Sequence, residues 1–202
     1  MPFDRVPGWV ERYDAAHPDT RWAVEPGAAR GESADGTRVI IAVPFEPMAD
    51  VSLDGLAAHL QLPWQVGIVL VRRGGFAVAR LDGATVDASK IGRRHVQGRT
   101  KAGGWSQQRF ARRRDNQARA AFDAAAEHVQ RLLLGSARPL ALLATGGDRR
   151  AVASVLAHPE LARLADVPQV WLGGLPDATR AVLDAAIDQV RSVEITITDP
   201  TD

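Results

Sequence analysis

The sequence contains no cysteine among its 202 residues. Disulfide bonds, thiolate nucleophiles and cysteine-ligated zinc or iron–sulfur sites are therefore excluded. Long apolar runs are also missing: the longest, at 39–45, 66–71 and 139–144, are far shorter than the roughly 18 to 20 residues that cross a bilayer. The first residues lack the pattern of a signal peptide. We therefore expect a cytoplasmic protein without membrane contact.

The sequence lacks the residues that several kinds of catalytic site require. The five histidines have no partners at metal-ligand spacing, so we expect neither a metal nor a cofactor. The loop that begins at Gly98 is not that of an NTPase, because Gly104 and Trp105 stand where Lys and Ser or Thr are required. No Gly-x-Ser-x-Gly elbow is present. Residues 66–72 contain no acid that would bind the divalent ions of a ribonuclease-H-type nuclease.

Positive charge is concentrated in one stretch of the chain. Ten of the 25 Lys and Arg residues lie between Lys90 and Arg119, where Asp115 is the only acid, although the formal net charge of the chain is +1. Such a cluster indicates a surface for a polyanion such as RNA. The candidate RNA-binding residues are Arg93, Arg94, Arg99, Lys101, Trp105, Arg109, Arg112, Arg113 and Arg119.

The chain pattern predicts two parts. Residues 1–64 form an N-terminal lobe, which is rich in Pro and Gly up to residue 38 and is expected to be small and irregular, with one short helix. Residues 65–202 form an α/β domain with the element order βββαβαβα. The expected strands in this order are 66–72, 76–81, 84–90, 139–144 and 169–172, of which the first three form an antiparallel meander, and a further strand is expected at 193–198. The expected helices are 107–134, 148–158 and 177–190, and residues 53–60 of the N-terminal lobe also have helical spacing. This order predicts a ribonuclease-H-like mixed sheet flanked by helices.

The junction before the long helix has the residues of a functional loop. Gly103 and Gly104 allow the backbone to approach a substrate closely, and the start of a helix offers free N–H groups to an anion. Gln107 and Gln108 can orient a water molecule without titrating. The alternative interpretation is a glycine hinge in which Ser106 caps the helix.

The segment 103–114, with the sequence GGWSQQRFARRR, resembles the Gly-Gly-Gln loop and the following Arg-Phe-Ala-Arg helix in the middle domain of archaeal and eukaryotic class-one peptide release factors. The resemblance covers about residues 65–191. It includes the hairpin at 67–81, the helix through 134, the strand-to-helix turn at 142–148 and the strand at 170–174.

One position departs from the release-factor pattern. When the sequences are matched on 109–112, Trp105 occupies the glutamine position, and the nearest glutamine is Gln107. The shifted arrangement is similar to that of the release-factor-like peptidyl-tRNA hydrolases of the Vms/ANKZF group, especially their actinobacterial branch. The resemblance implies that Gln107 is the catalytic glutamine. Gln108 is the alternative if the loop register differs by one residue.

The resemblance implies hydrolysis of the peptidyl-tRNA ester during ribosome rescue and quality control. The implied partners are peptidyl-tRNA and the large-subunit RNA near the peptidyl transferase centre, and the implied catalytic set is Gly103, Gly104, Ser106, Gln107 and Gln108. Trp105 either stacks on a terminal base or anchors the loop to the domain. Two alternatives stay open: cleavage of the tRNA acceptor end, and a noncatalytic module that binds the ribosome or tRNA.

Overall fold

The computed structural model describes residues 1–45, 47–72, 74–93 and 119–200, which fall into two compact units. The first unit contains Met1–Pro63 and Asp188–Asp202, and the second contains Trp64–Ile187. The C-terminal residues, which the sequence pattern assigned to the α/β domain, thus lie in the first unit. No described helix has the length and apolar character needed to span a membrane.

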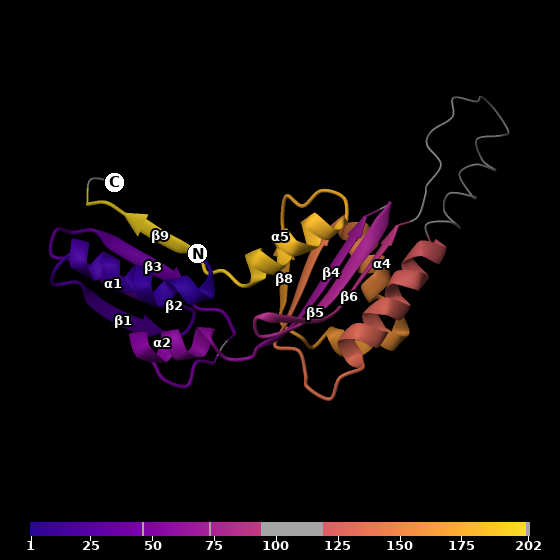
Figure 1. Cartoon of the computed structure of the whole chain (residues 1–202), viewed down its shortest axis with the longest axis horizontal. Helices are drawn as coiled ribbons and strands as arrows, with labels where there is room; N and C mark the ends of the chain where they lie inside the picture. Colours follow the sequence, from indigo (N-terminus) through magenta and orange to yellow (C-terminus); the bar gives the residue numbers. More distant parts are fainter. Residues whose placement is uncertain (46, 73, 94–118, 201–202) are drawn as a thin grey trace, which may run out of the picture. The chain divides into compact units, whose positions relative to one another are not determined.

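The first unit is built on a four-stranded antiparallel sheet in the order β1-β2-β3-β9 (Figure 1). Its elements are η1 (Phe3–Arg5), α1 (Val6–Ala16), β1 (Arg21–Glu25), β2 (Ala28–Glu32), β3 (Arg38–Ala42), α2 (Leu53–Leu60) and β9 (Ile195–Thr198). The last strand, β9, returns from the C-terminal end of the chain to pair with β3. Val6, Ile41 and Leu56 are almost fully buried in the core between sheet and helices.

The prediction of an irregular lobe over residues 1–38 is wrong. The breakers that suggested it lie at the turns of regular elements: Gly27 (φ 82°) joins β1 to β2, and Gly36 (φ 88°) joins β2 to β3. Pro26 before Gly27 is the residue order that a type II turn favours. Pro7 lies in the first turn of α1, where its missing N–H costs nothing. The breakers therefore mark short elements and tight connections.

The second unit is a mixed α/β domain, which confirms the predicted fold class. Its elements are β4 (Gln65–Arg72), β5 (Gly75–Asp82), β6 (Thr85–Arg93), helical residues 119–129 continued by η2 (Gln130–Leu134), β7 (Leu142–Gly147), α4 (Arg149–Leu156), η3 (Pro159–Leu164), β8 (Gln169–Leu172) and α5 (Arg180–Val190). The five strands have the order β6-β5-β4-β7-β8. The first three form the predicted antiparallel meander, and β4, β7 and β8 run parallel. This is a ribonuclease-H-like arrangement.

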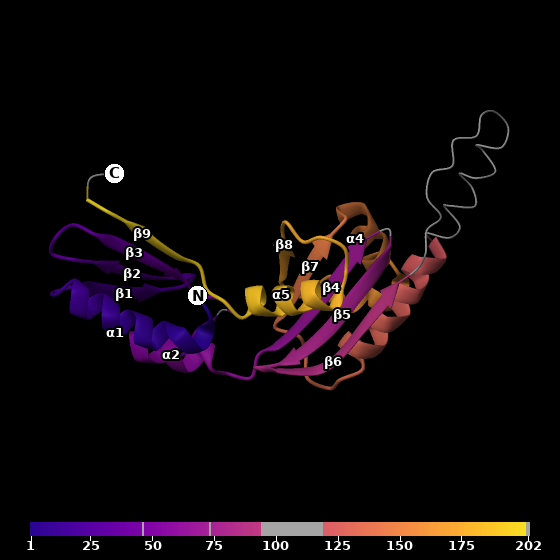
Figure 2. The same ribbon diagram turned by 45° about the horizontal axis from the view of Figure 1, so that its top comes forward.

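Helices cover both faces of the five-stranded sheet (Figures 1 and 2). The helix of residues 119–134 and α4 pack on one face, where their buried residues form a cluster with Val69, Val71, Phe76 and Val78. These strand residues alternate, as side chains on one face of a strand must. The helix α5 lies on the other face.

The carboxyl ends of the parallel strands meet at one edge of this sheet. There β4 ends beside the first residues of β5, because Arg72 pairs with Gly75, and Gly75 in turn pairs with Arg93 at the end of β6. The last residue of β6, Arg93, therefore lies at this edge. The carboxyl edge is also where ligands bind to open α/β sheets.

Candidate nucleic-acid interface

Most of the predicted functional residues lie outside the described residues. These are Gly103, Gly104, Ser106, Gln107 and Gln108 of the expected catalytic set, and Arg94, Arg99, Lys101, Trp105, Arg109, Arg112 and Arg113 of the expected RNA-binding set. Two candidates are described. Arg93 is the last residue of β6, and Arg119 is an exposed residue of the long helix. These two positions bound the basic segment on its N-terminal and C-terminal sides.

A cleft of about 180 Å³ lies between the carboxyl edge of the sheet and the long helix. It is lined by Val71, Arg72, Gly75, Phe76, Lys90, Gly92, Ala121, Phe122, Ala124 and His128. The lining comes from the ends of β4, β5 and β6 on one side and from the helix on the other. The two attachment points of the segment 94–118 are therefore adjacent to the same cleft.

Strand register explains which β6 residues reach this cleft. Gly92 pairs with Phe76, and Lys90 pairs with Val78. Because paired residues in adjacent strands share a face, Lys90 and Gly92 lie on the face that the long helix covers. A Cβ atom at Gly92 would be only 2.3 Å from the ring of Phe76. Glycine is therefore required at position 92 for the ring to occupy its place.

Aromatic side chains contribute much of the cleft wall. The Phe76 and His128 ring centroids are 5.4 Å apart, and the rings are tilted by 34°. Phe76 is buried, whereas Phe122 and His128 are half-buried. The cleft thus combines a fixed phenyl ring with two ring systems that keep part of their surface exposed.

The surroundings of His128 favour the neutral imidazole by lowering its pKa. Burial lowers its pKa below the usual 6.5, Arg131 and Lys90 lower this pKa further, and Glu127 opposes them. A guanidinium N–H of Arg131 donates to Nδ1 of His128 over 2.6 Å. Because arginine has only donors, Nδ1 acts as the acceptor and the proton resides on Nε2. The imidazole therefore offers a donor at Nε2 without a positive charge.

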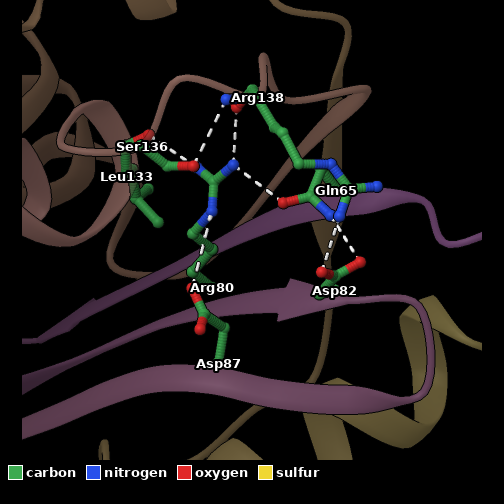
Figure 3. A network of polar contacts seen from close by, with 7 residues as sticks. All are labelled: Gln65, Arg80, Asp82, Asp87, Leu133, Ser136 and Arg138. Atoms are coloured by element: carbon green, nitrogen blue, oxygen red, sulfur yellow. Dashed lines mark hydrogen bonds and ion pairs between the residues drawn. The ribbon is translucent and has the colours of Figure 1, made fainter.

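The opposite end of the long helix is fixed by a buried arginine (Figure 3). Arg80, in β5, is 1% exposed. Its guanidinium donates to the carbonyl oxygen of Leu133 over 2.9 Å, to that of Arg138 over 2.6 Å, and to Oε1 of Gln65 over 2.8 Å. The last carbonyls of a helix lack partners within the helix. Arg80 satisfies one of them and ties the helix end to the sheet.

The surrounding carboxylates complete this network (Figure 3). Asp82 accepts from Gln65 over 2.7 Å and from Arg138 over 2.6 Å. Burial lowers the pKa of Arg80, while Asp87, 4.0 Å from its Nε, raises it. The sequence pattern predicted only a strand at Arg80. The available signal was a single charged residue within the apolar run 76–81.

The connection between β7 and α4 is sterically restricted as well. Gly147 has φ 104°, and a Cβ atom there would be 2.3 Å from the carbonyl oxygen of Val71. Asp148 follows as the helix cap, with Oδ1 accepting from the backbone N–H groups of Arg150 and Ala151. This close approach holds β7 and α4 against the carboxyl end of β4, one wall of the cleft.

No group of three His, Asp or Glu side chains that could hold a metal ion occurs in the described ranges.

One family model matches the sequence. It is the model described as "Actinobacteria/chloroflexi VLRF1 release factor", and it matches residues 64–196, which is more than half of the chain. The matched range includes the five-stranded sheet, the cleft, the Arg80 network and the whole basic segment. No curated protein matches the sequence.

Proposed function

Because the chain belongs to the VLRF1 release factor family of Actinobacteria and Chloroflexi, we propose that it releases nascent peptides from stalled ribosomal complexes by hydrolysing the peptidyl-tRNA ester. The observation that carries this proposal is the position of the basic Gly-Gly segment within the matched residues 64–196. Its two ends adjoin one cleft at the carboxyl edge of the sheet. We also propose that the chain is related to class-one release factors and to the Vms/ANKZF group.

Gln107 is the residue that we assign to water positioning. The peptidyl-tRNA ester is already activated, so a positioned water and stabilisation of the tetrahedral oxyanion suffice for hydrolysis. The side-chain amide of Gln107 or its backbone N–H holds the water, and Gly103 and Gly104 allow close approach to the ester. Ser106 belongs to the same proposed catalytic set. Gln108 is the alternative water-positioning residue.

The basic residues supply the contacts to RNA. Arginine binds phosphate through a planar fork of donors, and such contacts fix the position of a protein on RNA without reading its sequence. The proposed contacts are Arg93, Arg94, Arg99, Lys101, Arg109, Arg112, Arg113 and Arg119, with Trp105 stacking on a base. The partners are peptidyl-tRNA and the large-subunit RNA near the peptidyl transferase centre, which implies a cytoplasmic location.

The experiment that tests the proposal uses large ribosomal subunits that carry labelled peptidyl-tRNA. The purified full-length protein is added, the released peptide is measured, and the 3′ end of the tRNA is mapped. Ester hydrolysis predicts free peptide and an intact tRNA terminus. A shortened acceptor end would instead support cleavage of the tRNA. Binding without any released product would leave a noncatalytic RNA-binding module and contradict the proposal.

A further inference from the structure

The cleft beside β6 has dimensions and walls that suit a single flat ring. Its volume of about 180 Å³ is below the roughly 300 Å³ at which pockets for drug-sized ligands begin. Phe76, Phe122 and His128 supply aromatic surface, and Ala121 and Ala124 leave open space on the helix side. Stacking on aromatic side chains is the usual way in which proteins hold an unpaired base.

The charges around the cleft favour a nucleotide over an uncharged ring. Lys90 lines the cleft and is exposed, whereas the guanidinium of Arg72, another lining residue, donates to the carbonyl oxygen of Leu175. Arg131 adds a second cation beside His128, while Glu127 is the acid that raises the pKa of the same imidazole. An apolar slot flanked by cations matches a base with its phosphate.

We propose that this cleft is a subsite for one unpaired nucleobase of the RNA bound by the basic segment, with Lys90 contacting the adjoining phosphate. The base stacks against Phe122 and His128, and Nε2 of His128 donates a hydrogen bond to an acceptor on the base edge. The inference rests on the proposed RNA-directed function. It adds to that function a base-binding site formed by described residues outside the Gly-Gly loop.

The test compares two short single-stranded RNAs that differ at one position. One carries 2-aminopurine there, and the other carries an abasic residue. The wild-type protein is expected to bind the base-containing strand at least about fivefold more tightly, the lower end of the effect of one stacked base. The fluorescence of the 2-aminopurine is expected to be quenched when the strand binds. Equal affinity for the two strands, or no binding of either, would overturn the inference.

A matched pair of variants locates the effect. Ala124→Leu fills the cleft, whereas Ala120→Leu places the same side chain on an exposed position of the same helix. The first variant is expected to lose the preference for the base-containing strand, and the second to keep it. Loss in both variants, or in neither, would contradict the assignment to this cleft.

A direct measurement covers the case in which Ala124→Leu fails to fold. A strand with 4-thiouridine at the test position is cross-linked to the wild-type protein, and the modified residue is identified. Attachment within 121–128 or at Phe76 supports the inference, and attachment elsewhere contradicts it. Because these assays measure binding alone, a protein that discriminates the base but releases no peptide refutes the proposed hydrolysis and leaves the base site standing.

Discussion

The guanidinium of Arg80 donates to the carbonyl oxygen of Leu133 over 2.9 Å, although the two residues are 53 positions apart in the chain. One belongs to a central strand and the other to the last turn of the helix that follows the basic segment. The bond fixes the C-terminal end of this helix to the sheet. The helix that follows the basic segment is therefore anchored to the sheet at its C-terminal end.

Replacing Arg80 is expected to destabilise the second unit strongly. Arg80→Ala removes three hydrogen bonds, two of them buried, to Leu133 and Gln65, and a buried group left unsatisfied costs roughly 1–3 kcal/mol. We expect a loss of at least about 3 kcal/mol in the free energy of unfolding by urea. Arg30→Ala is the control, because it removes an exposed ion pair with Glu25 and is expected to cost less than about 1 kcal/mol. Equal losses would mean that the buried network contributes nothing.

Gly147 is expected to tolerate no side chain. Gly147→Ala forces a residue with a Cβ into φ 104° and against the carbonyl oxygen of Val71, and such backbone strain costs roughly 1–3 kcal/mol. Thermal unfolding should show a lowered midpoint. Gly173→Ala is the matched control, since no atom lies within 4 Å of its added Cβ. If the two variants melt at the same temperature, the turn before α4 is not the constraint described here.

His128 is expected to make the fold sensitive to mild acid. Its pKa in the folded protein is lowered, chiefly by burial. The stability that the neutral imidazole contributes is therefore complete above its unfolded pKa of about 6.5 and is lost as the pH falls through the lower folded value. His128→Gln should reduce the loss of thermal stability between about pH 7 and about pH 5. The control His17→Gln should retain this loss, and an unchanged profile in His128→Gln would contradict the assignment.

Arg119 is expected to contact an RNA phosphate. Arg119→Gln should weaken binding to single-stranded RNA and reduce the slope of log affinity against log salt by about one. Arg21→Gln removes an exposed charge from β1 in the first unit and should leave the slope unchanged. A slope that responds equally to both changes would indicate nonspecific charge attraction.

Local patterns in the sequence predicted much of the second unit. The strand at 169–172 agrees with β8, and the helix at 53–60 in the first unit agrees with α2. The predicted meander is confirmed, because two closely spaced turns leave its strands no other simple pairing. The strand expected at 139–144 instead begins at Leu142, since apolar composition alone does not reveal where ladder pairing starts.

These local patterns could not predict which strands pair when they are far apart in the sequence. The strand expected at 193–198 exists as β9, but its partner is β3, more than 150 residues earlier in the chain. No local signal distinguishes that partner from the edge of the nearer sheet. The same limit applies to Arg80, whose acceptors come from three separate segments. The expected catalytic set of Gly103, Gly104, Ser106, Gln107 and Gln108 lies outside the described residues and stays a prediction.

The central claim is that Gln107 positions the water that attacks the ester. The most direct test is the single-turnover rate of peptide release from peptidyl-tRNA on large subunits, measured for the wild-type protein, Gln107→Ala and Gln108→Ala at equal ribosome occupancy. We predict that Gln107→Ala slows release about a hundredfold or more, the effect of losing one transition-state hydrogen-bond group, while Gln108→Ala retains most of the rate. Release by Gln107→Ala at the wild-type rate would contradict the claim.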